Sequence, residues 1–530
     1  MKMTWTCLLL LPLALSAAPL PIIPAPREVT AGEGTFTLPA QVRFYAGSEC
    51  PPFGRSVEQA ARARGGDIVW CDFNQPAHIR GVAADPGALA ADAYELSIAT
   101  NGITIRAGSA AAGHHAVQSL YWLVDACTST PAVLPCVEIR DAPRYGWRGF
   151  MLDESRHFFG PAVVRSLLDQ MSRLKLNVFH WHLTDEPAWR IEILKYPKLT
   201  EVGGTGSWSD ARKPAAFYTQ QEIRDLVAYA AERHITIVPE IDMPGHANAA
   251  TRAYPEFGAP GPGRWNGFTF HPAREATYQF LEDVLTEVAG LFPGPWIHVG
   301  GDEVHYGNMS WTSDVEIVAF TKQQGLKNAV ELEHYFMRRV AGIVQGKLGR
   351  QLVGWDEIAG SGLKPAGTVP MWWRHDKPKV LDQVLAGGFP VVLAPRHPCY
   401  FDFVQDDAHK VGRRWDGFND LARVYAFPQN LEAQLAAAAP GQVLGLNACL
   451  WTERVADPHR LGFMTFPRLA ALAESAWTVT ERKDLEDFRA RVPLLLKLLD
   501  RAGLSYFNPH DPAAMPEPDG PSKADIIANG

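Results

Sequence analysis

Two adjacent carboxylic acids, Asp302 and Glu303, follow an apolar run in the segment WIHVGGDEV. Such a run is typical of a buried strand, and the two glycines before the acids favour close approach of a ligand or of another backbone segment. Successive side chains of an extended backbone point to opposite sides, so these acids are not expected to face each other across one bond. We therefore expect each acid to have its own chemical task.

A second cluster of ionisable side chains follows another apolar run, in VPEIDMPGHANAA. Glu240, Asp242 and His246 surround a turn at Pro244-Gly245, which can bring their side chains together. Two further segments repeat the pattern. Asp185 follows the run in NVFHWHLTDEP, and Arg156 follows the run in RGFMLDESRHFFG. A fixed cation can hold ligand hydroxyl groups or neutralise buried acids, and both interpretations of Arg156 stay open at this stage.

Aromatic residues recur beside acids in the second half of the chain. Tyr400 and Asp402 lie in CYFD, and Glu453 follows a tryptophan in LWTE. Pyranose rings offer apolar C–H faces to aromatic rings and hydroxyl groups to acids, so this combination predicts a carbohydrate site. The tryptophans at strand ends or in the long loop are Trp355, Trp372, Trp415 and Trp451.

These motifs need a scaffold that brings strand ends together. After residue 142 the sequence alternates apolar runs with helical patterns, and several runs are apolar throughout, as a parallel sheet buried on both faces requires. The pattern predicts an α/β fold, a (β/α)₈ TIM barrel, whose active site lies where strands end. The expected strands are Arg148–Asp153, Asn177–His182, Thr236–Ile241, Trp296–Gly300, Gln351–Trp355, Val369–Trp373, Val391–Ala394 and Leu444–Trp451. Between Pro395 and Gln442 we expect a long loop.

The rest of the chain divides by composition. Residues 1–18 resemble a signal peptide, because Lys2 precedes a short apolar run and Ser16-Ala17-Ala18 supplies small residues for cleavage. We therefore expect export to the periplasm or the medium, and no membrane span. Residues 19–142 alternate with period two around Asn101-Gly102, which predicts a small α+β domain with a hairpin. The barrel is expected over 143–480, a C-terminal helical segment packing on it over 481–507, and a frayed Pro-rich tail over 508–530.

Composition narrows the class of partner. The net charge of −8 supplies no basic field for nucleic acid, and 47% hydrophobic with 20% charged residues is typical of a globular protein. No C-x-x-C motif occurs, which argues against a structural zinc site. Cys127 and Cys136 are close enough in sequence to close a small disulfide loop, although spacing alone does not fix the pairing.

The ordered motifs closely resemble the β-N-acetylhexosaminidases of glycoside hydrolase family 20 over about residues 20–480. They are RGFMLDESRHFFG, HWHLTDEPAWRIEI, VPEIDMPGH, HVGGDE, GWDE, MWW, YFD and LWTE. The resemblance implies an exo-acting enzyme that removes terminal β-linked N-acetylglucosamine or N-acetylgalactosamine with retention at the anomeric carbon. The implied partner is a glycan, with no cofactor and no metal, and the oligomeric state stays open.

The resemblance also implies residue roles. Glu303 matches the general acid/base, and Asp302 matches the residue that holds the substrate's 2-acetamido group, whose oxygen is the nucleophile in such enzymes. Tyr400 matches a phenol that bonds the acetamido carbonyl, and Asp242 with His246 matches a pair that supports the acid. Residues matching the binding of sugar hydroxyls are Arg156, Asp185, Asp402 and Glu453, and those matching aromatic walls are Trp355, Trp372, Trp451 and, more loosely, Trp415. In MWW, strand alternation and family spacing favour Trp372 over Trp373.

Three alternatives stay open. A metal-dependent amidohydrolase would use His180, His182, His246, His298 and Asp302, because imidazoles two residues apart on a strand share a face. A carbohydrate-binding protein without activity would have lost one of the two adjacent acids, and both are present. An ordinary retaining glycosidase would use two facing carboxylates, one of them as nucleophile.

Overall fold

The computed structural model describes residues 20–47, 53, 56–58, 67–72, 75–85 and 87–521. The predicted signal peptide, Cys50 and the end of the tail lie outside these residues, so the signal peptide stays a prediction. Within the described ranges, no helix combines the length and the apolar character needed to cross a membrane.

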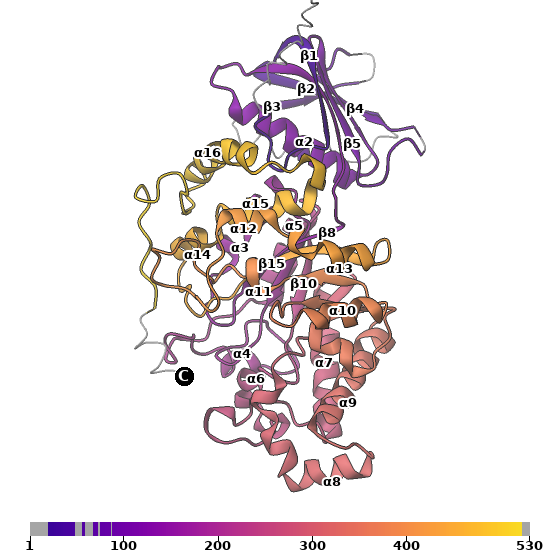
Figure 1. Cartoon of the computed structure of the whole chain (residues 1–530), viewed down its shortest axis with the longest axis vertical. Coiled ribbons are helices and arrows are strands. Elements are labelled where there is room, and N and C mark those ends of the chain that lie inside the picture. The colour runs from indigo at the N-terminus through magenta and orange to yellow at the C-terminus, as the bar shows by residue number, and fades with distance from the viewer. Residues whose placement is uncertain are drawn as a thin grey trace, which may run out of the picture.

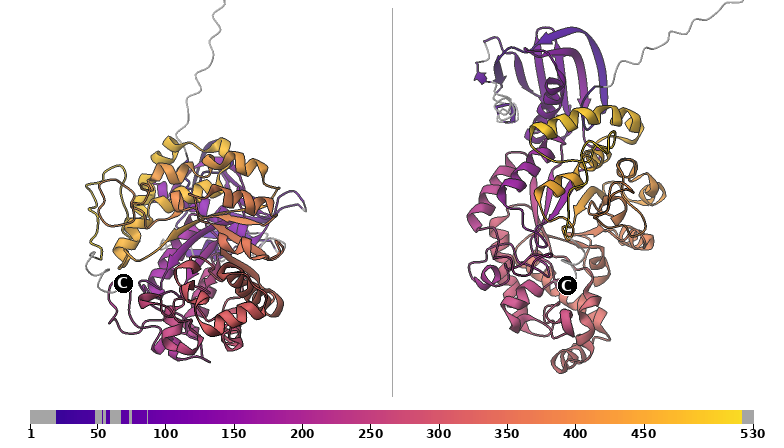
Figure 2. Two further views of the ribbon diagram at one scale, coloured as in Figure 1. Left: turned by 60° about the horizontal axis from the view of Figure 1, so that its bottom comes forward. Right: turned by 90° about the vertical axis from the view of Figure 1, so that its left-hand side faces the viewer.

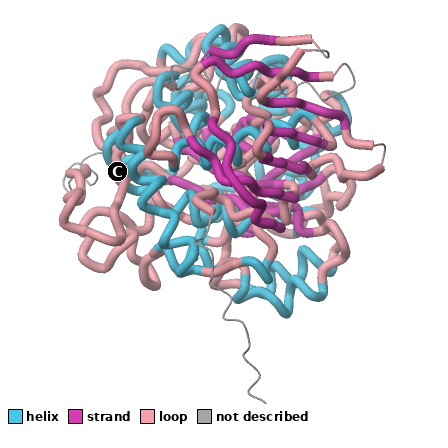
Figure 3. The backbone as a smooth tube through the Cα atoms, turned by 90° about the horizontal axis from the view of Figure 1, so that it is seen from above, coloured by secondary structure: helices cyan, strands magenta, loops and turns pink. Residues whose placement is uncertain are grey.

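The N-terminal part is a separate layer above the barrel, drawn in indigo and purple in Figure 1. Its seven strands form one sheet in the order β1-β7-β5-β6-β4-β2-β3, and helix α2 (Ala110–Ala126) packs against this sheet. Strands β5 (Tyr94–Ala99) and β6 (Gly102–Ala107) are antiparallel, with Ala99 opposite Gly102, which confirms the predicted hairpin. The other strands are β1 (Glu28–Thr37), β2 (Gln41–Ala46), β3 (Asp67–Trp70), β4 (Ile79–Ala83) and β7 (Val133–Asp141). Figure 3 shows the strands in magenta, seen from above.

Eight parallel strands close the predicted barrel. Strand β15 pairs with β8 through Gly445 and Trp147, which joins the last strand to the first. The predicted fold class is confirmed, and each strand lies within two residues of its expected bounds. The strands are β8 (Trp147–Asp153), β9 (Val178–His182), β10 (Thr236–Glu240), β11 (Trp296–His298), β12 (Gln351–Trp355), β13 (Thr368–Trp372), β14 (Val391–Leu393) and β15 (Val443–Leu450).

Helices cover the outside of the barrel. Their apolar stripes supply the outer core, and helix α5 (Gln220–Ala231) begins with a capping box in which Thr219 and Glu222 bind each other's backbone N–H groups. Helix α9 (Ala329–Ala341) continues as a wider turn over Gly342–Lys347. The other longer helices are α3 (Pro161–Arg173), α7 (Glu275–Leu291), α8 (Val315–Gln323), α10 (Pro378–Ala386), α14 (Pro458–Thr465) and α15 (Arg468–Trp477).

Alternation along the strands sorts side chains into two layers. On β8, Phe150 and Leu152 belong to the large apolar cluster shared with the helices, whereas Met151 belongs to a smaller cluster inside the barrel. The same rule places the residues that end β9 and β10, His182 and Glu240, in the interior. The strand ends therefore direct polar groups toward one mouth of the barrel.

Helix α16 (Leu485–Arg501) confirms the predicted C-terminal helix and lies between the small domain and the barrel (Figure 2). Arg491 of α16 pairs with Glu474 of α15 at 2.7 Å and donates to the carbonyl of Ile22 at 2.7 Å. This buried arginine thus joins helices α15 and α16 to the N-terminal segment, which is far from both in sequence.

The described part of the tail is docked, so the expectation that it frays is wrong up to residue 521. Glu517 accepts hydrogen bonds from the backbone N–H groups of Lys410 at 2.7 Å and Val411 at 2.9 Å, and pairs with Arg460 at 3.1 Å. These interactions satisfy loop donors that sequence patterns do not reveal, and they hold the tail against the long loop that follows β14.

The cysteines of the described residues are free thiols: Cys71, Cys127, Cys136, Cys399 and Cys449. The Cys127 thiol donates to the carbonyl of Val133 at 3.3 Å. The small disulfide loop between Cys127 and Cys136 is therefore not formed.

Candidate active site

A cavity of about 210 Å³ opens where the barrel strands end. It is smaller than the ~300–1,000 Å³ typical of pockets for drug-sized ligands, which suits a single sugar unit. A larger cavity of about 700 Å³, where the small domain meets the barrel, contains none of the predicted site residues. Most of those residues line the small cavity: Arg156, Asp185, His246, Asp302, Glu303, Tyr400, Trp415, Trp451 and Glu453. The others, Asp242, Trp355, Trp372 and Asp402, are buried outside this lining.

Asp302 and Glu303 reach the cavity on a bent backbone. Gly300, Gly301 and Glu303 have φ angles of 66°, 94° and 51°, so the chain has left the strand before the acids. The expected alternation to opposite sides is therefore wrong. Asp302 Oδ2 and Glu303 Oε2 lie 3.8 Å and 3.7 Å from the same atom, Nε2 of His246. The two acids still differ, because the Asp302 side chain is buried and that of Glu303 is 34% exposed.

The glycine before the acids is required by space as well as by its φ angle. A Cβ at Gly300 would lie 1.6 Å from Oδ1 of Asp242. Only glycine therefore permits the close approach of β11 to the loop that carries Asp242 and His246.

His246 connects the acid pair to Asp185 and Arg156. Its Nδ1 donates to Asp185 Oδ1 at 3.0 Å, and the other oxygen of Asp185 pairs with Arg156 Nη1 at 2.7 Å. Burial lowers the pKa of His246, but the charge and hydrogen bond of Asp185 and the charges of Asp242 and Asp302 together outweigh burial and raise the pKa well above its ordinary value. The imidazolium thus presents its Nε2–H to Asp302 and Glu303.

Asp242 lies near His246 without bonding it. Oxygens of Asp242 and Asp302 and a ring nitrogen of His246 lie within 4.8 Å of one another. Among the described residues, neither side-chain oxygen of Asp242 has a hydrogen-bond partner. The residue that bonds His246 is therefore Asp185, because the Nδ1 edge of the ring faces Asp185.

Burial also changes the protonation of the acids. Burial, with the charge of Asp302 added, raises the pKa of Asp242 well above its ordinary value. Burial raises the pKa of Asp302 to about 7, where Glu303 adds to the shift and His246 opposes it. Neighbouring acids in a dry site therefore resist being ionised together.

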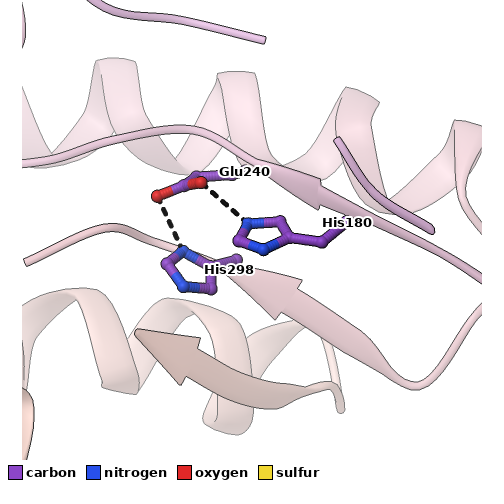
Figure 4. Close-up of side chains that lie close together, drawn as sticks. All are labelled: His180, Glu240 and His298. Atoms are coloured by element: carbon purple, nitrogen blue, oxygen red, sulfur yellow. Dashed lines mark hydrogen bonds and ion pairs between the residues drawn. The ribbon is translucent and has the colours of Figure 1, made fainter. Parts of the chain in front are cut away.

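Glu240 anchors this network inside the barrel (Figure 4). Its Oε2 accepts hydrogen bonds from His180 Nε2 and His182 Nδ1, both at 2.7 Å, and its Oε1 pairs with His298 Nδ1 at 2.9 Å. Trp355 Nε1 donates to Oε1 at 3.0 Å. One buried carboxylate thus orients three imidazoles and a predicted aromatic wall.

His182 extends the network from Glu240 to the cavity. Its Nε2 donates to Asp185 Oδ2 at 2.7 Å while its Nδ1 donates to Glu240. Burial lowers the pKa of His182, but the charges and hydrogen bonds of Glu240 and Asp185 together outweigh burial and raise that pKa well above its ordinary value. Charges therefore alternate from Glu240 through His182 and Asp185 to His246.

The metal alternative depends on the same histidines. Groups of imidazole and carboxylate atoms within 4.8 Å occur here in the described residues, including His180, Glu240 and His298. His180 Nε2 is bonded to the carboxylate, and His298 Nδ1, which lies 2.9 Å from the carboxylate, accepts the backbone N–H of Gly300, whereas a metal ligand must offer a free lone pair. The residues fit a hydrogen-bonded network better than a metal centre.

Asp402 and Glu453 share an arginine that the sequence analysis did not select. Arg413 Nε pairs with Asp402 Oδ2 at 2.6 Å, and Arg413 Nη2 pairs with Glu453 Oε1. Burial raises the pKa of Asp402 to about 7. Burial also favours a higher pKa for Glu453, but Arg413 and Arg156 outweigh it and lower that pKa below its ordinary value.

Aromatic rings surround the inner end of the cavity. Trp355 and Tyr400 belong to the cluster inside the barrel, and Trp373 and Trp451 pack against it. The ring of Trp451 lies 5.8 Å from that of Trp355 and 6.1 Å from that of Tyr400. Trp415 is 55% exposed and lines the cavity from the long loop.

Trp373, not Trp372, lines the cavity, so the choice made from the sequence is wrong. Val369 and Met371 of β13 belong to the interior cluster, and alternation places position 373 on the same side. Trp372 packs in the outer layer against the helices. The sequence shows that strand residues alternate but does not show which set faces inward.

Comparisons with known proteins identify the family of the chain. Residues 145–480 match the family model described as glycosyl hydrolase family 20, catalytic domain, and residues 20–142 match glycosyl hydrolase family 20, domain 2. The chain belongs to glycosyl hydrolase family 20. It is a glycoside hydrolase, and the resemblance inferred from the motifs is confirmed.

Several known proteins are similar along most of the chain. A β-hexosaminidase of Porphyromonas gingivalis is 34% identical over 528 residues, covering 96% of this chain and 66% of that protein. One of Vibrio furnissii is 34% identical, covering 87% and 77%. The exo β-N-acetylglucosaminidase of Vibrio harveyi, solved with N-acetylglucosamine, has a TM-score of 0.85 at 32% identity, covering 94% of this chain and 80% of that chain.

The tryptophan assignment in this family 20 site is testable. Trp373→Phe should lower kcat/KM for an aryl N-acetylglucosaminide by about tenfold with stability nearly unchanged, because it removes part of a wall that meets the ligand. Trp372→Phe should instead destabilise the fold by about 1–3 kcal/mol, because it leaves space in the outer core. Steady-state kinetics and urea unfolding of both variants would check this. If Trp372→Phe lost activity and Trp373→Phe lost stability, Trp372 would be the residue that meets the ligand.

Proposed function

We propose that this family 20 enzyme is an exo-acting β-N-acetylhexosaminidase that hydrolyses terminal β-linked N-acetylglucosamine or N-acetylgalactosamine through substrate-assisted catalysis. The similarity to β-hexosaminidases and to an exo β-N-acetylglucosaminidase supports the reaction, and the chain spans about two thirds or more of the length of these relatives. The proposed mechanism uses the acetamido oxygen of the substrate as nucleophile, so no enzyme carboxylate bonds to the sugar.

One observation carries the proposal. Of the carboxylates that line the cavity, Asp185 and Glu453 are each paired with an arginine. The other two, Asp302 and Glu303, are neighbours in sequence and face the same nitrogen of His246. Such a pair supports a mechanism in which one acid donates a proton and its neighbour holds the acetamido group of the substrate. It does not support a mechanism that needs two carboxylates on opposite faces of a sugar ring.

Glu303 is proposed as the general acid and base. Its partly exposed side chain can reach the oxygen that links the sugar to its leaving group. It gives its proton to that oxygen as the glycosidic bond breaks, and it takes a proton from the water that opens the oxazolinium ring. The product then keeps the β configuration.

Asp302 and Tyr400 are proposed to hold the acetamido group. An ionised Asp302 accepts the amide N–H and stabilises the positive charge that develops when the oxazolinium ring forms. The Tyr400 hydroxyl donates to the acetamido oxygen and turns it toward the anomeric carbon. Trp355, Trp373 and Trp451 would enclose the methyl group and exclude water from this side of the ring.

The remaining charged residues are proposed to bind the sugar. Arg156 and Asp185 would meet ring hydroxyls near the His246 side of the cavity, and Glu453 would meet others near Arg413. Asp402 lies outside the cavity lining and is proposed to reach a further hydroxyl with Oδ1, which has no hydrogen-bond partner among the described residues. Trp415 would cover an apolar face of the sugar ring. These roles cover the predicted site residues except Trp372, Asp242 and His246, of which His246 faces the acid pair without touching the sugar in this proposal.

Paired aryl glycosides test the proposal. The enzyme should hydrolyse 4-nitrophenyl β-N-acetylglucosaminide at least about 100-fold faster than the matching β-glucoside, because the glucoside lacks the nucleophile. A thiazoline analogue of the oxazolinium ion should inhibit tightly. Equal turnover of both glycosides, or a trapped sugar covalently bound to an enzyme side chain, would overturn the mechanism.

The N-terminal segment supports a proposal about location. The charged, apolar and small-residue pattern of residues 1–18 favours an exported enzyme, acting on glycans in the periplasm or outside the cell. Fractionation of cells that express the full chain, with N-terminal sequencing of the product, would test both export and cleavage near Ala18.

A further inference from the structure

Arg413 lies in the long loop between β14 and β15 and contacts three of the predicted sugar-binding residues. Its Nε pairs with Asp402 at 2.6 Å, its Nη2 pairs with Glu453, and its guanidinium carbon lies 4.4 Å from the centre of the Trp415 ring. Arg413 also lines the cavity that holds Glu303. One side chain therefore touches three residues that come from two different loops.

The backbone fixes Arg413 relative to Asp402. The N–H of Arg413 donates to the carbonyl of Asp402 at 2.8 Å, and the N–H of Val404 donates to the carbonyl of Arg413 at 3.2 Å. Gly412 has a φ of 147°, and a Cβ there would lie 2.6 Å from a methyl carbon of Val404. This part of the loop is therefore tightly packed, and the reach of Arg413 toward both acids is built into it.

Each acid keeps one oxygen for another partner. Arg413 takes Oδ2 of Asp402 and Oε1 of Glu453. Among the described residues, Oδ1 of Asp402 and Oε2 of Glu453 are buried and have no hydrogen-bond partner. Buried acceptors of this kind are costly unless a ligand donates to them, and sugar hydroxyls are such donors.

We propose that Arg413 is a positioning residue that sets the affinity for the non-reducing sugar by holding Asp402 and Glu453 with one oxygen each turned toward the sugar's hydroxyl groups. The inference rests on the proposed function and adds to it a residue outside the motifs that identify the family. A planar guanidinium can bind two carboxylates at once in fixed directions, whereas a lysine ammonium is a single point charge.

The charges around the two acids give the inference a pH signature. Losing Arg413 should raise the pKa of both carboxyls, because it is the main cation that opposes the effect of burial on each. The acids would then be protonated over more of the neutral range and would accept hydroxyl protons less well. The other groups that face them include Arg156, Asp185 and His157 beside Glu453, and Tyr400, Cys449 and Arg468 beside Asp402.

The test compares Arg413→Met and Arg413→Lys with the neighbouring Arg414→Met. For 4-nitrophenyl β-N-acetylglucosaminide, Arg413→Met should raise KM about 10- to 100-fold while kcat changes less than about threefold. The KM of Arg413→Lys should lie between the values of the parent and of Arg413→Met. The acid limb of the pH profile of kcat/KM for Arg413→Met should move to higher pH. Arg414 pairs with exposed Asp407, so Arg414→Met should match the parent.

A double-mutant cycle with Glu453→Gln distinguishes a specific action through Glu453 from a general loss of order in the loop. If Arg413 acts through Glu453, the combined loss in kcat/KM should be clearly smaller than the product of the single losses. Unchanged KM and superimposed pH profiles in both Arg413 variants would overturn the inference. If Arg413→Met does not fold, the pH profile and KM of Arg413→Lys decide. A parent enzyme that does not hydrolyse the substrate would instead count against the proposed function.

Discussion

Replacing Glu303 by Gln should lower kcat for 4-nitrophenyl β-N-acetylglucosaminide by on the order of 10⁴-fold, the upper end of what a general acid and base contributes. Glutamine keeps the shape of the side chain but has no acidic proton to transfer to the leaving oxygen. The exposed third of Glu303 and its contact with His246 Nε2 indicate that the loss is chemical and not structural. Thermal unfolding should therefore be nearly unchanged.

The leaving group makes the Glu303 test more specific. A 2,4-dinitrophenyl glycoside departs with little protonation, so the Glu303→Gln variant should lose much less on this substrate than on an alkyl glycoside. Added azide, which needs no base to attack, should restore part of the turnover. The exposed Glu316→Gln, whose parent side chain pairs with Arg274 on the surface, is a matched control that should keep full activity. Equal losses on all leaving groups would argue against an acid role.

Replacing Asp302 by Asn should lower kcat/KM for N-acetylated substrates by on the order of 10³-fold, comparable with the loss of one preorganised electrostatic contact to a transition state. Asparagine cannot supply the negative charge that stabilises the oxazolinium ion. The loss should be much smaller on any residual hydrolysis of a plain β-glucoside, because that substrate has no acetamido group to hold. A similar loss on both substrates would contradict the role.

The same Asp302 variant should lose activity but gain stability. The folded pKa of Asp302 is about 7, above the ordinary value of about 3.9 for an unfolded chain. Between about pH 4 and 7 the folded state therefore binds a proton that the unfolded state has lost, so this residue makes stability fall as pH rises through that window. Asp302→Asn should unfold at higher temperature than the parent at pH 7, with a smaller difference at pH 4.

Residues with large effects need not touch the sugar. Glu240 lies inside the barrel, yet it fixes Trp355 directly and Asp185 through His182. Strand alternation indicates that Glu240 and Asp242 share a face, which is the signal that places Glu240 near the site. What the alternation does not reveal is that four side chains converge on this one carboxylate.

Local pattern was enough to predict the scaffold. Parallel strands buried on both faces must be apolar along their whole length, so the eight runs were visible without any tertiary information, and their bounds agree with those of the structure within two residues. The acid pair after β11 was also visible, because a glycine pair that releases two carboxylates at a strand end has little structural use. The predictions that failed depend on contacts between distant segments.

The chain by itself determined the barrel, the small domain before it, and the set of acids, tryptophans and histidines brought to one mouth, because periodicity and motif order are properties of neighbouring residues. Only the tertiary structure decided that Trp373 and not Trp372 faces the cavity, that His246 bonds Asp185, that Arg413 joins Asp402 to Glu453, and that Glu517 docks the tail. Each of these depends on which face of an element turns inward, or on a contact between segments that in some cases are a hundred or more residues apart. The pattern of neighbouring residues contains no information on either.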